Sequence, residues 1–469
     1  MNTNSILKSL PRILRVGVAT LLVTLGMQAQ ATVIGWTGDA VVDANNHTTR
    51  TFTLTAKQDF ISTSDGNSHY AWGYAHGNEF AMQYPGPTLI VNQGDTVKVT
   101  LNNTLPVPVS IVFPGQGGVT AINGNAGMLT REAPALAQLP SADAAPVAGP
   151  TYTFVATNAG TYMYHSGTNP DLQIEMGLIG ALIVRPTGCD AASTTVLCKI
   201  AYTNQGTGFD REHLFVLSEM DTDFHWQVYG QVFSGLPVEM DASTIHPSIW
   251  FINGRNAPDT LLENGVYWLP TQPYNALPRM HPGERLLMRV VSAGRDLHPF
   301  HHHGNHATAI ARDGQVLTSV PGGSPDLTSP EFTIRAIPGQ TLDLVYEWTG
   351  KGIGFDIYGT VDVNPHDCVP DNNGFDVTTK EWCADHYKAI PVTIPGQLDI
   401  AYGESYSGSP FLGLTGILPQ GHPGLNTTGG YFHMLHSHNE KEITTDNIFP
   451  GGMMTMLIVE PWSVNLDTE

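Results

Sequence analysis

The chain has few charged residues, and few of those are basic. Charged residues make up 13% of its 469 residues, against roughly a quarter in an average soluble domain. Its 21 basic and 42 acidic residues give a net charge of −21, which argues against a nucleic-acid-binding protein. Ala, Glu, Lys, Leu and Arg do not dominate, so a coiled coil is excluded. The 41% of hydrophobic residues can build a core, which excludes a long disordered chain.

Long apolar runs are also lacking after the N-terminus, so we expect no membrane span in the mature chain. At the N-terminus, three basic residues precede an uncharged apolar stretch, 16–27, and the small-residue motif Ala29-Gln-Ala31. This layout predicts a cleaved signal peptide over residues 1–31 and a secreted or periplasmic protein of net charge −24. An uncleaved N-terminal anchor is the alternative.

Cysteine is scarce, with four residues in the chain. Cys189 and Cys198 are nine positions apart, and Cys368 and Cys383 are fifteen apart. Export permits disulfides, so we expect two local disulfides. A cysteine metal site is less favoured, because no Cys-x-x-Cys motif occurs.

Helical periodicity is scarce beyond residue 31, whereas strand-like segments recur between Gly, Pro and Asn at the spacing of a β-sandwich or barrel. The clearest are 51–55, 88–91, 96–101, 151–156, 181–184, 286–291 and 341–346. Two stretches also repeat. The segment that begins at Gly160 and contains His165 resembles the one that begins at Gly430 and contains His436, 270 residues later. The second copy is preceded by 79 extra residues, 351–429, which we interpret as a long insertion; a third small domain is the alternative.

Histidine, by contrast, is abundant, with 19 residues. On a strand, His301 and His303 would point to one face and His302 to the other. His436 and His438 repeat the spacing of His301 and His303. We expect these two pairs to converge with His165 and His298 on a metal. Imidazole without thiolate favours copper(II), with zinc next. For His302 and His306 we favour supporting or core positions.

The motifs that contain these histidines resemble those of the multicopper oxidase and copper nitrite reductase superfamily. The resemblance rests on four stretches: Tyr84-Pro-Gly-Pro-Thr88 with Asn92-Gln-Gly-Asp95; Tyr164-His165-Ser166; His298-Pro-Phe-His301-His-His303-Gly304; and His436-Ser-His438 with Met453 or Met454. It implies an all-β fold of two cupredoxin-like Greek-key sandwich or barrel domains, 32–190 and 191–469, the second with the insertion 351–429. It also implies copper as the cofactor.

The chain departs from the family pattern at several metal positions. The segment 108–118, where the family has its first histidine motif, contains no histidine, and Gly167 replaces the second histidine of the next motif. Ser437, or Ser166 when nitrite reductases are the reference, stands where the family has the cysteine ligand of its blue type 1 copper. A hydroxyl cannot replace that thiolate.

The sequence therefore predicts an exported copper oxidoreductase of the multicopper oxidase type, with an incomplete histidine site and no blue centre. A small oxidisable molecule would be its substrate. A non-enzymatic copper-sequestering protein and a structural module on the same fold are the alternatives. Two-domain relatives assemble as trimers, so a homotrimer could complete the site from a neighbouring subunit.

Overall fold

A computed structural model describes residues 33–136, 145–189, 196–362, 364–389, 408–410 and 430–466. The predicted signal peptide and residues 390–407 and 411–429 of the predicted insertion lie outside the described residues. Each of the seven predicted strand segments lies in an observed strand, except that Ala156 falls one position beyond its strand. No helix among the described residues is long and apolar enough to cross a membrane.

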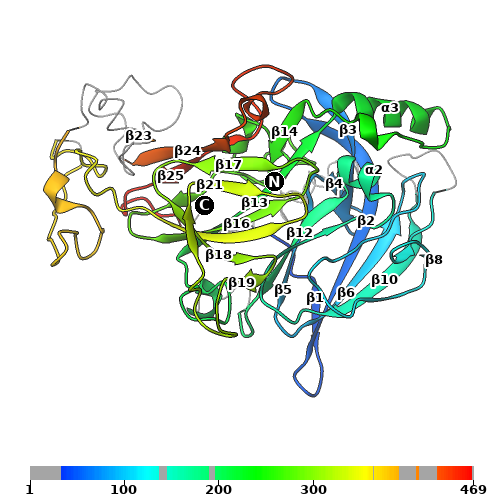
Figure 1. Cartoon of the computed structure of the whole chain (residues 1–469), viewed down its shortest axis with the longest axis horizontal. Helices are drawn as coiled ribbons and strands as arrows, with labels where there is room; N and C mark the ends of the chain where they lie inside the picture. Colours follow the sequence, from blue (N-terminus) through cyan, green and yellow to red (C-terminus); the bar gives the residue numbers. More distant parts are fainter. Residues whose placement is uncertain are drawn as a thin grey trace, which may run out of the picture.

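The first half of the chain forms a sandwich of two sheets (Figure 1). Its strands are β1 Asp39–Val42, β2 Thr48–Ser62, β3 Ser68–His76, β4 Met82–Gln83, β5 Gly86–Asn92, β6 Thr96–Asn103, β7 Thr120–Ile122, β10 Val147–Val155, β11 Gly160–His165 and β12 Ile179–Arg185. One sheet has the order β4-β3-β2-β6-β10-β7, with β1 beside β2, and the other has the order β11-β12-β5. The short strands β8 Asn125–Ala126 and β9 Arg131–Glu132 pair separately.

The second half forms another two-sheet sandwich. Its strands are β13 Arg211–Met220, β14 Ile249–Ile252, β15 Arg279–Met280, β16 Arg285–Ser292, β17 His298–His302, β18 Ala307–Arg312, β19 Gln315–Val316, β20 Ser329–Glu331, β21 Thr333–Ala336, β22 Thr341–Glu347, β23 Gly408–Pro410, β24 Tyr431–Ser437 and β25 Met454–Val459. One sheet has the order β14-β13-β16-β22-β18-β19, with β20 beside β18. The other has the order β15-β25-β24-β17-β21, with β23 beside β24. The fold is therefore all-β with two cupredoxin-like sandwiches, as predicted.

Helices among the described residues are few and short. They are α2 Pro170–Glu175 and α3 Thr222–Phe233, with 3-10 turns η1 Val196–Lys199, η2 Ala242–Thr244, η3 Asp259–Leu261, η4 Cys383–Asp385 and η5 Glu440–Ile443. The Asp221 side chain caps α3 by accepting a hydrogen bond from the Phe224 N–H. Phe224 and Val228 of α3 pack into the core of the first sandwich, although they follow the predicted domain boundary at residue 190.

The predicted repeat corresponds to two similar strand pairs. In the first sandwich β11 pairs antiparallel with β12, and in the second β24 pairs antiparallel with β25. A short helix lies between the strands in each case, α2 in the first and η5 in the second. Both predicted disulfides are present, Cys189–Cys198 and Cys368–Cys383.

The two sandwiches pack against each other through an apolar layer. It contains Ile90 and Ile183 from the first sandwich and Leu214, Val216 and Val291 from the second. Strands β12 and β16 lie between this layer and their own cores, so nearly every residue of each is buried. Burial on both faces explains why these strands are continuous apolar runs rather than alternating ones.

A buried ion-pair network also joins the sandwiches. Glu212 of β13 pairs with Arg185 of β12 and with Arg289 of β16, whose Nε lies 2.8 Å from a carboxylate oxygen. The Arg289 guanidinium donates a 2.9 Å hydrogen bond to Thr161 of β11, which in turn donates to Asp343 of β22. Burial would raise the pKa of Glu212, but the two guanidiniums lower it to about 2. The network fixes the position of one sandwich on the other.

We predict that Glu212→Gln lowers the free energy of unfolding by about 3–5 kcal/mol, because it leaves two guanidiniums buried without their carboxylate. The matched control is Glu347→Gln. Glu347 pairs with Arg285 at the surface, so its loss should cost less than about 1 kcal/mol. Thermal and denaturant unfolding measure both variants, and equal effects would contradict the prediction.

Candidate metal centre

Four histidines meet where β17 pairs with β24. In this antiparallel pair His301 lies opposite His436, and Phe300 lies opposite Ser437. Since side chains alternate between the two faces of a strand, His301 and His436 point out of the core, and His303 and His438 follow on the same side. His302 points inward and is buried, and its Nε2 accepts a hydrogen bond from the Ala307 N–H. The alternation predicted for the His301–His303 run is therefore correct.

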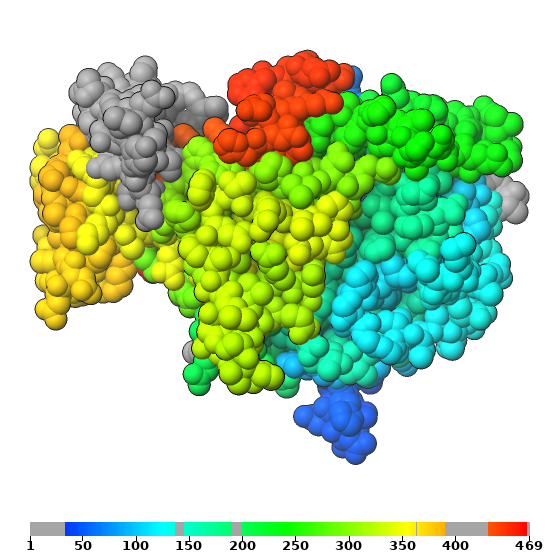
Figure 2. Space-filling model, in the orientation of Figure 1, coloured from blue at the N-terminus to red at the C-terminus, as the bar shows by residue number. Residues whose placement is uncertain are grey.

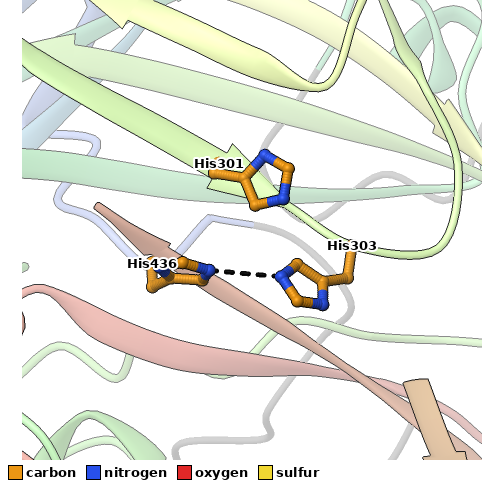
Figure 3. A group of neighbouring side chains, drawn as sticks. All are labelled: His301, His303 and His436. Carbon is orange, nitrogen blue, oxygen red and sulfur yellow. Dashed lines mark hydrogen bonds between the residues drawn. The ribbon is translucent and has the colours of Figure 1, made fainter. Parts of the chain in front are cut away.

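The rings of the four outward histidines lie in contact with one another. Nε2 of His303 lies 3.2 Å from Nε2 of His436, and one ligand atom each of His301, His303 and His436 lies within 4.8 Å of the other two. Figure 3 shows the three rings directed toward a common space between the two strands. The centroid of the His438 ring lies 5.0 Å from that of His301 and 5.7 Å from that of His436.

Hydrogen bonds orient two of these rings. Nδ1 of His301 lies 2.9 Å from the Thr333 hydroxyl, and Nδ1 of His436 lies 2.7 Å from the carbonyl oxygen of Ser437. A proton on each Nδ1 would satisfy these oxygens and leave Nε2 as the ligand atom. Fixing the tautomer in this way is the usual role of groups that surround metal-binding histidines.

Two of these imidazoles favour the neutral form, which is the form that binds metal. Burial, together with the neighbouring histidines, lowers the pKa of His301 to about 4. Burial also lowers the pKa of His436. A positive charge on more than one of these rings would be unfavourable, whereas neutral imidazoles can bind one transition-metal ion together.

His165 lies apart from this cluster. It ends β11 in the first sandwich, and it does not join the group of potential ligands formed by the described residues His301, His303 and His436. Its Nδ1 lies 2.9 Å from the carbonyl oxygen of Ser166, and burial lowers its pKa. His165 forms an isolated antiparallel β-bridge with Val112. Val112 belongs to the segment 108–118, where the family has its first histidine motif. The first sandwich thus presents one imidazole, which its hydrogen bond orients and which lies outside the histidine cluster.

His298 occupies a different environment from the outward histidines. It is fully buried, and its two ring nitrogens lie 2.9 Å from a Glu219 oxygen and 2.8 Å from a Glu442 oxygen. Burial would lower its pKa, but the two carboxylates raise it to about 9. Each ring nitrogen of His298 therefore contacts a carboxylate, an arrangement that favours the imidazolium form.

Hydrogen bonds also satisfy the two serines that stand at the family's cysteine positions. The Ser437 hydroxyl donates to Glu442 at 2.6 Å, the same carboxylate that binds His298. The Ser166 hydroxyl donates to the Gln173 side chain at 2.6 Å. Our reading of the sequence missed Glu219, Glu442 and Gln173, because they lie outside the histidine motifs.

Comparisons with known proteins agree with this architecture. The sequence profile of the multicopper oxidase family matches residues 64–188. Multicopper oxidase MCE of Talaromyces pinophilus is 35% identical over 124 residues, which span 25% of this chain and 18% of that protein.

A solved structure extends the likeness of fold to most of the chain. Multicopper oxidase mgLAC superposes with a TM-score of 0.51 at 17% identity, covering 89% of this chain and 88% of the other. A blue copper oxidase from Nitrosomonas europaea superposes with a TM-score of 0.49 at 18% identity, covering 87% and 85%. Residues 64–188 therefore resemble the multicopper oxidase family in sequence, and the chain as a whole shares its cupredoxin-like fold with a multicopper oxidase.

Proposed function

We propose that the protein is an exported copper oxidoreductase whose copper site consists of His301, His303, His436 and His438, with no blue type 1 centre. The observation that carries the proposal is the 3.2 Å separation of the His303 and His436 Nε2 atoms. Two nitrogens bound to one ion at about 2.0–2.1 Å, the usual metal–imidazole distance, would be separated by a distance of this size. The family and fold support a copper oxidoreductase.

The donor set fits copper. It contains imidazole and no thiolate, and for such divalent sites the Irving–Williams order places copper(II) first. When bound there, copper would supply one-electron redox chemistry between a small oxidisable substrate and oxygen. The protein itself would orient the ligands. Thr333 and the Ser437 carbonyl bind Nδ1 of His301 and of His436, which leaves Nε2 of each ring for the metal, and burial favours the neutral form of His301.

The usual route for electrons into the family's oxygen site is replaced by an ion-pair cluster. His298, Glu219, Glu442 and Ser437 bind one another, so a substrate would have to react directly at the histidine site. This replacement favours the alternative function, a protein that sequesters copper without turnover. Oxygen uptake separates the two.

His165 and the location of the protein complete the proposal. Because His165 lies apart from the four histidines, we propose that it could contribute only through a neighbouring subunit, in a homotrimer like those of two-domain relatives. The two disulfides support the predicted export, since such bonds persist in oxidising compartments.

We predict that the copper-loaded protein shows a type 2 electron paramagnetic resonance spectrum, or a spin-silent coupled pair, without intense blue absorption. His301→Ala and His436→Ala should each lower the bound copper measured by elemental analysis, because each removes a ligand. His47→Ala, at an exposed hairpin, is the control. Unchanged copper in the two site variants, or a blue band in the native protein, would refute the site.

We predict copper-dependent oxygen uptake with at least one of a phenol, Cu(I), Mn(II) or Fe(II), and its loss in His301→Ala. An oxygen electrode measures the rate with each substrate. Full copper binding with no uptake for any of them would establish sequestration instead.

We predict that His298 makes stability fall at alkaline pH. Its pKa of about 9 in the folded protein lies above the unfolded value of about 6.5. Its contribution, on the order of 3 kcal/mol, is therefore complete below pH 6.5 and is lost as the pH rises through 9. His298→Gln should flatten the dependence of the unfolding midpoint on pH over this range.

The matched control for this pH dependence is His213→Gln. His213 is a second histidine of the core, and burial lowers its pKa to about 3. Its substitution should lower stability without changing the slope between pH 6.5 and 9. Equal slopes in the native protein and His298→Gln would rule out the imidazolium.

A further inference from the structure

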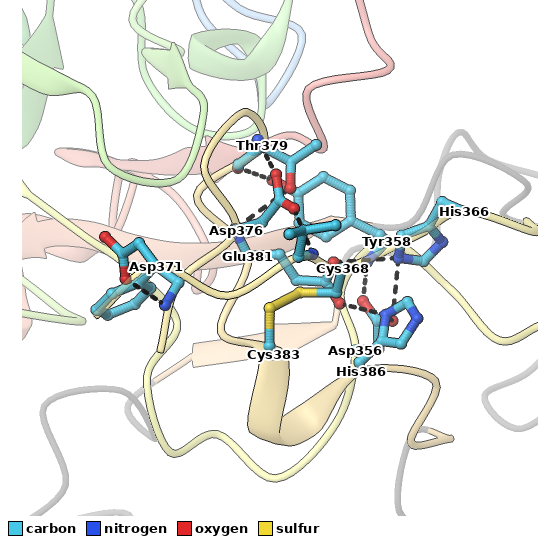
Figure 4. The surroundings of a disulfide bond; sticks show 12 residues. Asp356, Tyr358, His366, Cys368, Asp371, Asp376, Thr379, Glu381, Cys383 and His386 are labelled. Atoms are coloured by element: carbon cyan, nitrogen blue, oxygen red, sulfur yellow. Dashed lines mark hydrogen bonds and ion pairs between the residues drawn. A yellow bond between two sulfur atoms is a disulfide. The ribbon is translucent and has the colours of Figure 1, made fainter. Parts of the chain in front are cut away.

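A second group of potential metal ligands lies in the insertion, away from the four histidines. Residues 351–389, coloured yellow to orange, lie at the edge of the second sandwich, opposite the first sandwich (Figure 2). Within this segment Asp356, His366, Glu381 and His386 each present a ligand atom, and the four atoms lie within 4.8 Å of one another. Figure 4 shows the four side chains facing one another beside the Cys368–Cys383 disulfide.

Three of the four separations between these atoms have the size that one small cation requires. Nε2 of His366 lies 3.3 Å from an Asp356 oxygen and 3.3 Å from a Glu381 oxygen. Nδ1 of His386 lies 3.6 Å from the same Asp356 oxygen and 2.8 Å from the other Glu381 oxygen. Ligands at 2.0–2.2 Å around a tetrahedral zinc ion are about 3.3–3.6 Å apart.

The protein leaves polar atoms of this group without hydrogen bonds. The Glu381 side chain is 4% exposed, and its Oε2 lies 3.3 Å from Nε2 of His366 without a hydrogen bond of good geometry between them. The carboxylates of Asp356 and Glu381 are both buried beside each other. A buried carboxylate pair of this kind needs a positive charge.

The surrounding chain holds the ligand atoms in place. Nδ1 of His366 lies 2.7 Å from the carbonyl oxygen of Asn364, which directs Nε2 toward the carboxylates. Asp356 accepts hydrogen bonds from the backbone N–H groups of Tyr358 and Tyr387, both at 2.8 Å. The disulfide connects the stretch that carries His366 to the stretch that carries Glu381 and His386. The imidazoles are 16% and 22% exposed, so an ion could enter from their side.

We propose that Asp356, Glu381, His366 and His386 form a second metal site, which binds one zinc ion and stabilises the insertion. Two imidazoles and two carboxylates without sulfur are a zinc donor set. Because all four ligands come from the protein, the site has the closed form of a structural centre rather than the open form of a catalytic one.

The test uses the full chain with the first site removed. A His301→Ala/His436→Ala variant, stripped with chelator and then exposed to Zn(II) alone, should retain one zinc by elemental analysis and titration calorimetry. Zinc should also raise its unfolding temperature. Addition of His366→Ala/His386→Ala should abolish this zinc, and addition of Glu381→Gln should weaken its binding at least tenfold.

The control is His47→Ala in the same background, which should retain its zinc. Glu381→Gln keeps the shape of the side chain, so it decides the question if the double histidine variant fails to fold. Zinc binding that is absent, or that is unchanged by Glu381→Gln, would overturn the proposal. Copper at the first site is measured separately in the native protein, so a negative result for one proposed site does not contradict the proposal for the other.

Discussion

The antiparallel register of β17 with β24 is the constraint on which the first site depends. It places His301 opposite His436, and the period of two along each strand carries His303 and His438 to the same side. A slip of one residue would turn one pair into the core. The apolar residues between the histidines resist this slip, because Phe300 and Leu435 are fully buried in the second sandwich. Core packing therefore positions the imidazoles, with no need for the metal.

The same alternation determines what happens to the family's electron-entry position. Residues on the inner face, such as His298 and Ser437, must find partners inside the protein. They bind Glu219 and Glu442, and a protonated His298 compensates the buried carboxylates. Removal of His298 or of either carboxylate would leave a buried charge without its partner, so these side chains depend on one another.

The sequence allowed much of the fold and part of the site to be predicted, because both depend on short-range patterns. Strand segments, disulfides and the paired histidines are local in spacing. Partners distant in sequence could not be found in this way: Glu219 lies 79 positions from His298, and Glu442 lies 144 away. The insertion has no periodicity, although His366 and His386 lie close to Cys368 and Cys383, and that proximity was a usable signal.

The two histidine groups differ in how their geometry is maintained. The first stands on paired strands, where His301, His303 and His436 are half-buried. The second stands on irregular chain, where a disulfide closes a loop of fifteen residues and two buried carboxylates would repel each other without a cation. A regular sheet can therefore hold its ligands ready before metal arrives, whereas an ion at the proposed second site would itself add order to the insertion.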